Sequence, residues 1–133
     1  MNLVMDSSAL IALLRKEEGA EVVRSLIDAP ASSCFVHAVN LCEIYYGFRR
    51  ESGEETAQKA IGAILQIGVQ LRDDMDPEFW QAAGRYKADL KLPLGDAFLL
   101  AAAERTESEV VTADRHELEA VAQEGLATIR FIW

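Results

Sequence analysis

The stretch NLVMDSSALIALLR, residues 2–15, decides the fold class of this chain. Its first part, residues 2–6, is short and apolar, which predicts a buried strand. Two serines follow at once, and serine is a residue that commonly caps the first turn of a helix. We therefore expect a strand at residues 2–6 that leads directly into a helix at residues 7–15.

The same alternation of strand and helix continues through the rest of the chain. Further strands are expected at residues 32–37, 69–73, 109–114 and 128–133. Further helices are expected at residues 18–29, 38–50, 54–67, 76–90, 94–106 and 115–125. The strands are short, apolar and rich in β-branched residues, which is typical of a parallel sheet covered by helices on both faces. Ligands of such sheets bind beyond the carboxyl ends of the strands.

The composition of the 133-residue chain, 50% hydrophobic and 26% charged, is that of one globular domain spanning residues 1–133. No apolar run is long enough to cross a membrane, and the N-terminus lacks the basic region of a signal peptide. The two cysteines, Cys34 and Cys42, lie among apolar neighbours without metal-binding spacing. We interpret them as reduced core residues of a cytoplasmic protein.

The net charge of −9 argues against a nucleic-acid partner held by a basic surface. It does not exclude such a partner, because carboxylates that bind a divalent cation also count as negative charge. The bound metal then supplies the positive field at the site.

Two acidic residues come directly after expected strands. Asp6 follows the apolar residues of the first strand, and Asp114 follows Val110, Val111 and Thr112. Each is a candidate for the functional edge of a parallel sheet. Each is equally a candidate helix cap, and Glu117 completes a loose capping box with Asp114.

Glu43 lies in a helix that is otherwise mostly apolar. It shares one helix face with Asn40 and Gly47, and we expect the rest of this helix to be buried nearly all round. A narrow polar stripe beside a small residue indicates the wall of a cleft. The alternative is a stripe on an exposed edge.

Asp96 lies within the almost wholly apolar stretch PLGDAFLLAAA, residues 93–103. If Gly95 is the N-cap, Asp96 lies in the first helical turn, where the helix dipole favours a carboxylate by about 0.3–1 kcal/mol. That is too little to explain a deeply buried carboxylate. The alternative to a helix-start residue is a metal ligand.

These four acidic residues together indicate a metal site. Carboxylates gathered at one sheet edge repel one another, and a divalent cation such as Mg2+ removes the conflict through its preference for oxygen ligands. Such a site activates water and stabilises phosphoryl transfer. Whether one or two ions bind is left open.

The residues that carry this pattern resemble the PIN domain family, specifically VapC-type toxin ribonucleases of type II toxin–antitoxin modules. The similarity lies in DSSA at 6–9, NLCEIYYG at 40–47, LGDAFLLAAA at 94–103 and VVTAD at 110–114. The blocks occur in family-like order and spacing. The resemblance implies a three-layer α/β/α sandwich around a central, mainly parallel sheet of four to five strands.

The resemblance also implies an activity, namely cleavage of single-stranded RNA with Mg2+ or Mn2+. The positions that match the family's acidic quartet are Asp6, Glu43, Asp96 and Asp114. The positions that match its supporting hydroxyl groups are Ser8 and Thr112. Asn40 departs from the family, whose members often carry Thr or Ser there, but it keeps a supporting polar group next to Glu43. Arg115, next to Asp114, is a candidate phosphate contact.

The expected partners are an RNA substrate and a cognate antitoxin, with a homodimer and a higher toxin–antitoxin assembly and no membrane. A carboxylate cluster is a natural receptor for an Arg or Lys of an inhibitor. Tyr45, Tyr46 and Phe48 are candidates for self-association or antitoxin contact, or else ordinary core residues.

Two other functions were weighed against this one. A non-catalytic α/β signalling or binding module with an acidic metal pocket, such as a phospho-accepting receiver, needs a paired acid after the first strand and a late lysine. A phosphatase-like hydrolase with a nucleophilic Asp usually needs a second acid two residues on, where this chain has Ser8. Both are disfavoured and neither is excluded.

Overall fold

The computed structural model describes residues 1–133 as five strands and seven helices. The strands are β1 (Asn2–Met5), β2 (Ser33–His37), β3 (Gln70–Arg72), β4 (Glu109–Thr112) and β5 (Ile129–Phe131). The helices are α1 (Ser7–Arg15), α2 (Ala20–Asp28), α3 (Ala38–Ser52), α4 (Glu54–Gln66), α5 (Pro77–Leu90), α6 (Leu94–Thr106) and α7 (Arg115–Gln123). Every expected element is present, with ends that differ by one or two residues.

The five strands form one sheet in the order β3-β2-β1-β4-β5, and every neighbouring pair is parallel. The chain builds outward from β1 to β2 and β3 on one side, and then places β4 and β5 on the other. The carboxyl ends of β1 and β4 therefore lie next to each other at the point where the strand order reverses. Open parallel sheets bind ligands at such a point.

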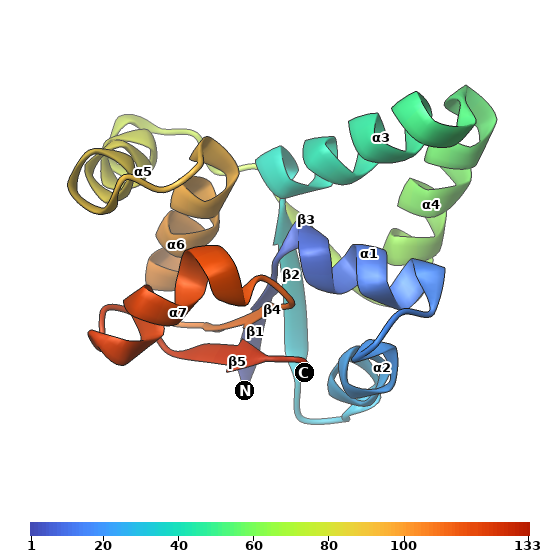
Figure 1. The fold of residues 1–133 in the computed structure, drawn as a ribbon, viewed down its shortest axis with the longest axis horizontal. Coiled ribbons are helices and arrows are strands. Elements are labelled where there is room, and N and C mark those ends of the chain that lie inside the picture. The colour runs from blue at the N-terminus through green and yellow to red at the C-terminus, as the bar shows by residue number, and fades with distance from the viewer.

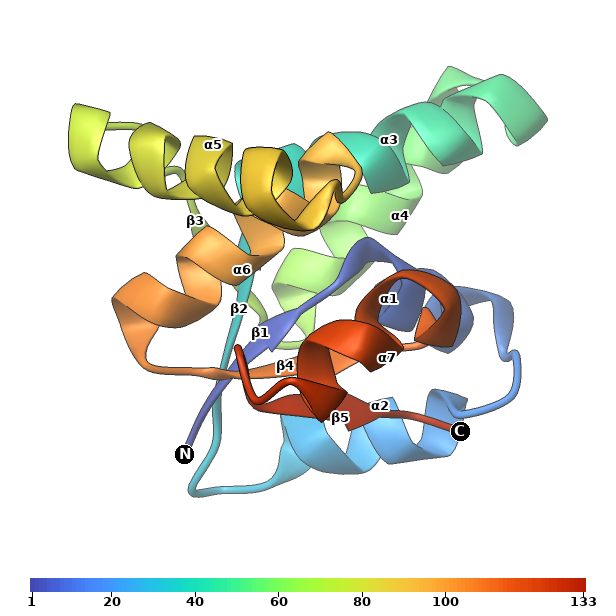
Figure 2. The same ribbon diagram turned by 60° about the vertical axis from the view of Figure 1, so that its left-hand side comes forward.

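Helices cover both faces of the sheet, which confirms the expected three-layer sandwich (Figures 1 and 2). Successive side chains along β1 point to opposite faces of the sheet and so pack in different helix layers. Leu3 and Met5 pack in the cluster formed by α1 to α4, whereas Val4 packs in the cluster formed by α5 to α7. No helix is long and apolar enough to cross a membrane.

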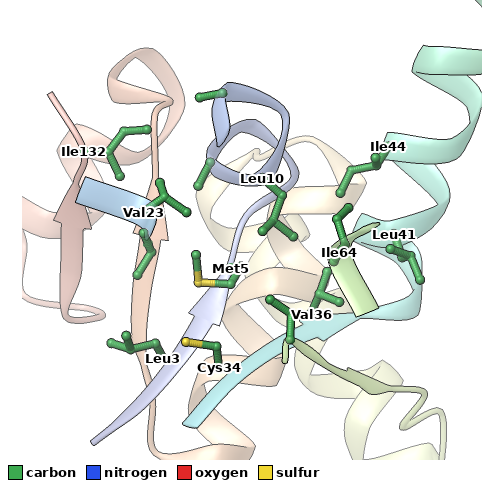
Figure 3. Packing of buried hydrophobic residues seen from close by; sticks show 14 residues of the cluster. Leu3, Met5, Leu10, Val23, Cys34, Val36, Leu41, Ile44, Ile64 and Ile132 are labelled. Carbon is green, nitrogen blue, oxygen red and sulfur yellow. The ribbon is translucent and has the colours of Figure 1, made fainter. Parts of the chain in front are cut away.

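The first core cluster holds α1, α3 and α4 against the sheet (Figure 3). Leu10 of α1, Ile44 of α3, Ile64 of α4 and Val36 of β2 are fully buried in it. Burial of each such side chain contributes about 1.5–3 kcal/mol. This packing fixes the starts of α1 and α3, the helices that carry part of the candidate site.

Helix α6 is buried between the sheet and α5. Its small residues Ala101, Ala102 and Ala103 allow close approach of its neighbours, and Leu99 and Leu100 are almost completely buried. The apolar run thus anchors this helix in the core. The prediction of Gly95 as N-cap was wrong, because the helix begins at Leu94 and Pro93 occupies the N-cap position.

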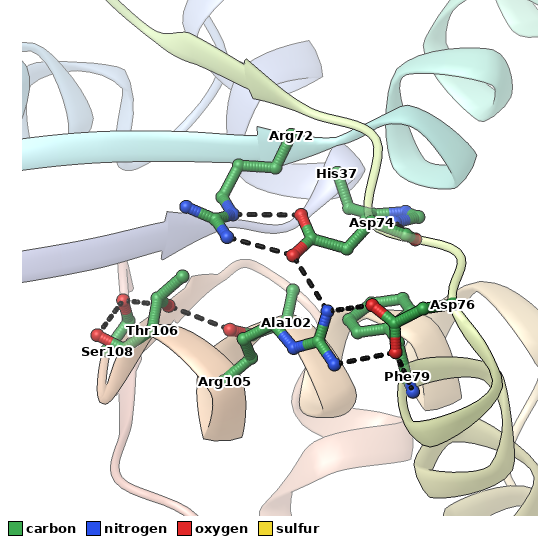
Figure 4. A network of polar contacts seen from close by, with 9 residues as sticks. All are labelled: His37, Arg72, Asp74, Asp76, Phe79, Ala102, Arg105, Thr106 and Ser108. Carbon is green, nitrogen blue, oxygen red and sulfur yellow. Dashed lines mark hydrogen bonds and ion pairs between the residues drawn. The ribbon is translucent and has the colours of Figure 1, made fainter.

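An ion network joins the end of α6 to the β3–α5 connection (Figure 4). Arg72 donates two hydrogen bonds to Asp74, at 3.0 and 2.9 Å, and Arg105 donates to both Asp74 and Asp76. Hydrogen bonds from Arg72, and secondarily from Arg105, lower the pKa of Asp74 to about 2. Asp76 also caps α5 by accepting from the Phe79 amide at 3.0 Å.

The outer side of α3 is more open than the sequence suggested. Cys34 is buried as expected, but Cys42 is exposed, and Tyr46 is 46% exposed. Phe48 is partly buried and packs on the first core cluster. The expectation of a helix buried nearly all round was wrong, because α3 packs against α1, α4 and α6 but leaves Cys42 and Tyr46 exposed, with Cys42 lining a pocket beside α4 and β3.

Candidate active site

Asp6 lies at the carboxyl end of β1 with only 2% of its surface exposed. Its Oδ2 accepts hydrogen bonds from Thr112 Oγ1 at 2.7 Å and from Ser8 Oγ at 2.8 Å. The residue occupies the N-cap position of α1, but its side chain makes no capping hydrogen bond. Capping therefore does not explain this carboxylate.

The two hydroxyls that donate to Asp6, those of Thr112 and Ser8, also accept hydrogen bonds from main-chain amides just after β4. Thr112 Oγ1 accepts from the Asp114 amide at 2.9 Å, and Ser8 Oγ accepts from the Ala113 amide at 3.0 Å. Asp114 caps α7 as expected, because its Oδ1 accepts from the Glu117 amide at 3.1 Å. Its other carboxylate oxygen makes no hydrogen bond within the chain.

Glu43 reaches the same region from α3. Its Oε1 accepts from Asn40 Nδ2 at 3.0 Å and from Ser7 Oγ at 3.3 Å. The Ser7 hydroxyl also lies 3.4 Å from Asp6 Oδ1, so it bridges the two acidic residues. On its other side Glu43 lies against Gly95 of α6, where an added Cβ would stand 2.3 Å from Oε2.

Asp96 occupies the first turn of α6, one residue after this contact, and is 8% exposed. Burial, followed by the nearby charges of Asp6, Asp114 and Glu43, raises its pKa to about 7. No hydrogen bond to its carboxylate offsets this cost. Ser7 bridges Asp6 and Glu43, Glu43 lies against the residue before Asp96, and Thr112 contacts both Asp6 and the Asp114 amide, so the four predicted acids lie together at this edge of the sheet.

Burial is also the largest cause of the raised pKa values of Asp6 and Glu43. None of the four carboxylates forms an ion pair with a Lys, Arg or His of the chain. The cluster is thus a group of acids without a cationic partner, two of them (Asp6 and Asp96) buried and two (Glu43 and Asp114) half-buried. A bound cation is the simplest partner for such a group.

Two of the basic and histidine residues near the cluster, Arg115 and His37, make contacts within the chain. Arg115 donates to the main-chain oxygen of Trp133 at 2.8 Å and lies 4.5 Å over the ring of Phe131. His37 is buried at the end of β2, where its Nδ1 accepts from the Val39 amide and caps α3. The His116 side chain is 93% exposed.

The cluster offers a suitable set of donors for a hard divalent cation. Carboxylate oxygens are the ligands that Mg2+ and Mn2+ prefer. In the present arrangement no three His, Cys, Asp or Glu side chains already converge as ligands of one ion. The four carboxylates come from four places in the fold: the residue after β1, the helix α3, the first turn of α6 and the N-cap of α7.

Two members of the site were not predicted in these roles. Ser7 appeared only as a helix cap, and Gly95 only as an N-cap. Their contacts to Glu43 join residues that are 36 and 52 positions apart in the chain. The only sequence signal is that both residues directly neighbour a predicted ligand.

Replacing Thr112 with valine should destabilise the chain without changing its shape. The variant loses a 2.7 Å hydrogen bond to the buried Asp6 carboxylate and the acceptor of the Asp114 amide. We expect a decrease of about 2 kcal/mol in the free energy of unfolding, measured by urea denaturation. Thr128→Val, at an exposed position, is the matched control and should change it little. Equal stability of both variants would contradict the role assigned to this hydroxyl.

Known proteins agree with this architecture. The sequence matches the PIN domain family model over residues 3–124. No curated protein matches the sequence. A chain of VapBC2 from Rickettsia felis, solved bound to a promoter DNA fragment, superposes with a TM-score of 0.76 at 14% identity, covering 100% of this chain and 99% of that one.

Two further structures extend the comparison. A chain of DNA-bound VapBC from Salmonella typhimurium gives a TM-score of 0.75 at 16% identity, covering 100% of this chain and 99% of that one. VapC20 from Mycobacterium tuberculosis, a Sarcin-Ricin loop cleaving toxin, gives 0.71 at 15% identity, with 89% and 94% covered. At these identities the likeness is one of fold. Together with the family match, which spans almost the whole sequence, it shows that the chain belongs to the PIN domain family.

Proposed function

We propose that this chain is a divalent-metal-dependent endoribonuclease that hydrolyses single-stranded RNA and acts as the toxin of a toxin–antitoxin pair. The observation that carries the proposal is the cluster of Asp6, Glu43, Asp96 and Asp114 at the switch point of the sheet, without a cationic partner in the chain. Membership of the PIN domain family supports it. So does the fold shared with VapC20, which is a toxin that cleaves the Sarcin-Ricin loop.

The four carboxylates are the proposed ligands of Mg2+, with Mn2+ as an alternative. A divalent cation there lowers the pKa of a bound water and offsets the charge that develops on the phosphate during hydrolysis. The ligands must turn toward a shared ion, because no three of them converge in the present arrangement. Asp96 must also give up its proton, because its pKa lies at about 7 in the metal-free chain.

The surrounding residues orient these ligands. Ser8 and Thr112 hold one oxygen of Asp6, which leaves the other, Oδ1, in contact only with the Ser7 hydroxyl at 3.4 Å. Helix α6 fixes the backbone of Asp96, and no hydrogen bond restricts its side chain. Hydrogen bonds thus orient Asp6 and Glu43, while the Asp96 side chain can turn toward a bound ion.

The proposed partners follow from the same cluster. Two of the neighbouring structures are VapBC complexes bound to DNA, so we propose a cognate antitoxin that places an Arg or Lys against the carboxylates. We also propose a homodimer within a higher toxin–antitoxin assembly, in the cytoplasm. An inhibitor's cation and a metal ion would compete for the same site, so the antitoxin should weaken metal binding.

The proposal is tested by cleavage of a fluorescent single-stranded RNA in Mg2+, in Mn2+ and in EDTA. Wild type should cleave only with a divalent metal, and Asp6→Asn should cleave at least about 100-fold more slowly. Asp89→Asn, an exposed position on α5, is the matched control and should be as active as wild type.

Two results would overturn the proposed activity. One is a wild-type protein that cleaves no RNA with either metal. The other is an Asp6→Asn variant that cleaves as fast as the control. Metal binding without cleavage would instead favour the non-catalytic module with an acidic metal pocket.

A further inference from the structure

Asn40 is fully buried at the start of α3 and makes two hydrogen bonds with one nitrogen. Its Nδ2 donates to Glu43 Oε1 at 3.0 Å and to the main-chain oxygen of Gly95 at 3.1 Å. The first bond orients a predicted metal ligand. The second ties α3 to the first turn of α6, next to Asp96.

Only an amide can satisfy both acceptors at once. A side-chain amide carries two N–H donors, whereas the hydroxyl of Thr or Ser carries one. Both acceptors would lose their partner on a change to an apolar residue, and one would lose it on a change to Thr. The residue type at position 40 is therefore matched to a link between two helices.

The oxygen of the same amide, Oδ1, is buried without any hydrogen-bond partner. A buried unsatisfied polar atom destabilises a fold and calls for a reason. An apolar side chain would avoid the unpaired oxygen but would leave the acceptor oxygens of Glu43 and Gly95 without their donor. The reason for an amide at this position is therefore its link from the Glu43 carboxylate to α6.

Gly95 completes the arrangement from the opposite side. A Cβ at this position would stand 2.3 Å from Glu43 Oε2 and 2.6 Å from its Cδ. The glycine has no positive φ, so backbone conformation does not require it. The close approach of the Glu43 carboxylate to α6 does require it.

We infer that Asn40 and Gly95 are positioning residues that clamp the Glu43 carboxylate against the N-terminus of α6 and so set its place relative to Asp96. Asn40 donates a hydrogen bond to Oε1 of Glu43, and Gly95 makes room for the whole carboxylate. The clamp contacts the carboxylate of Glu43 and makes no hydrogen bond to the carboxylate of Asp96, so its effect on the metal site is placed at Glu43. For its activity readout this inference rests on the proposed function.

The test uses Asn40→Leu and Gly95→Ala, with Mn2+ affinity measured by calorimetry alongside RNA cleavage. Gly95→Ala should fold, because the atoms that its Cβ displaces belong to the far end of a flexible side chain, and this variant carries the test if the fully buried Asn40→Leu does not fold. We expect each to bind Mn2+ at least about tenfold more weakly. Gly84→Ala is the matched control, because its added Cβ meets nothing within 4 Å, and it should bind as wild type does.

A double-variant cycle separates positioning from a merely structural role. If Asn40 acts through Glu43, then adding Asn40→Leu to Glu43→Gln should weaken Mn2+ binding no further than Glu43→Gln alone. Additive losses, or Asn40→Leu and Gly95→Ala binding Mn2+ as tightly as Gly84→Ala, would overturn the inference. Since the metal titration does not depend on RNA cleavage, a failure of the proposed ribonuclease activity leaves this test intact.

Discussion

Replacing Asp96 with asparagine should reduce metal-dependent RNA cleavage at least about 100-fold and, in the same variant, stabilise the metal-free chain at about pH 8. The two effects have one origin. Asp96 is buried among Asp6, Glu43 and Asp114, so its charge is costly unless a cation is bound. Asparagine removes the buried negative charge and, with it, the carboxylate that would bind the metal.

The stabilisation depends on pH, and its sign follows from the raised pKa. The pKa of Asp96 is about 7 in the folded chain against 3.8 for an ordinary Asp. The folded state therefore holds a proton that the unfolded state has lost, and Asp96 makes wild type less stable as pH rises from about 4 to 7. At pH 8 the free energy of unfolding of the variant should exceed that of wild type by on the order of 2 kcal/mol, a figure that allows for screening by water.

Urea denaturation in EDTA at pH 4 and pH 8 measures this difference. Asp89→Asn, at an exposed position, should show no such difference at either pH. A helix-start role for Asp96 predicts the opposite result, namely an asparagine variant that is less stable at high pH. That result, or full activity of Asp96→Asn, would contradict the assignment of Asp96 as a metal ligand.

The second large effect is expected at Phe79, whose replacement by alanine should lower the free energy of unfolding by about 3–5 kcal/mol. This ring is 2% exposed, stacks on His37 at 4.9 Å and lies 5.9 Å from the ring of Phe98. Arg105 covers it at 5.2 Å. The substitution leaves a cavity where α5 and α6 meet the end of β2.

The neighbouring residue provides the control. Trp80 is 47% exposed, and Trp80→Ala should cost less than about 1 kcal/mol. Both variants are compared with wild type by urea denaturation at pH 7. Similar losses in the two variants would show that the α5–α6 packing described here is wrong.

The fold could be predicted because local patterns and topology agreed. Residues 2–6 and 109–114 are short apolar strands with an acid at the end, and parallel strands bring such ends to one edge of the sheet. The predicted cluster of Asp6 and Asp114 follows from that geometry alone. Glu43 and Asp96 were added to it because each is the single acid of a mostly apolar stretch, residues 38–48 and 93–103.

The wrong predictions concern positions where packing between distant elements, and not the local sequence pattern, determines the role of the residue. Gly95 looked like a helix cap, but Pro93 holds that position and its carbonyl accepts the Ala97 amide at 3.1 Å. The glycine instead makes room for Glu43, a contact across 52 residues of sequence. Cys42 looked like a core residue, but it is exposed and lines a pocket together with residues of α4 and β3.

The central claim is that the four clustered carboxylates bind a divalent cation, and calorimetric titration of the metal-free chain with Mn2+ tests it most directly. Wild type and Asp89→Asn should bind Mn2+ with equal affinity, and Asp6→Asn should bind at least about tenfold more weakly. Binding should also weaken as pH falls below about 7, because Asp96 must lose its proton. Absence of Mn2+ binding by wild type, or equal binding by Asp6→Asn, would contradict the claim.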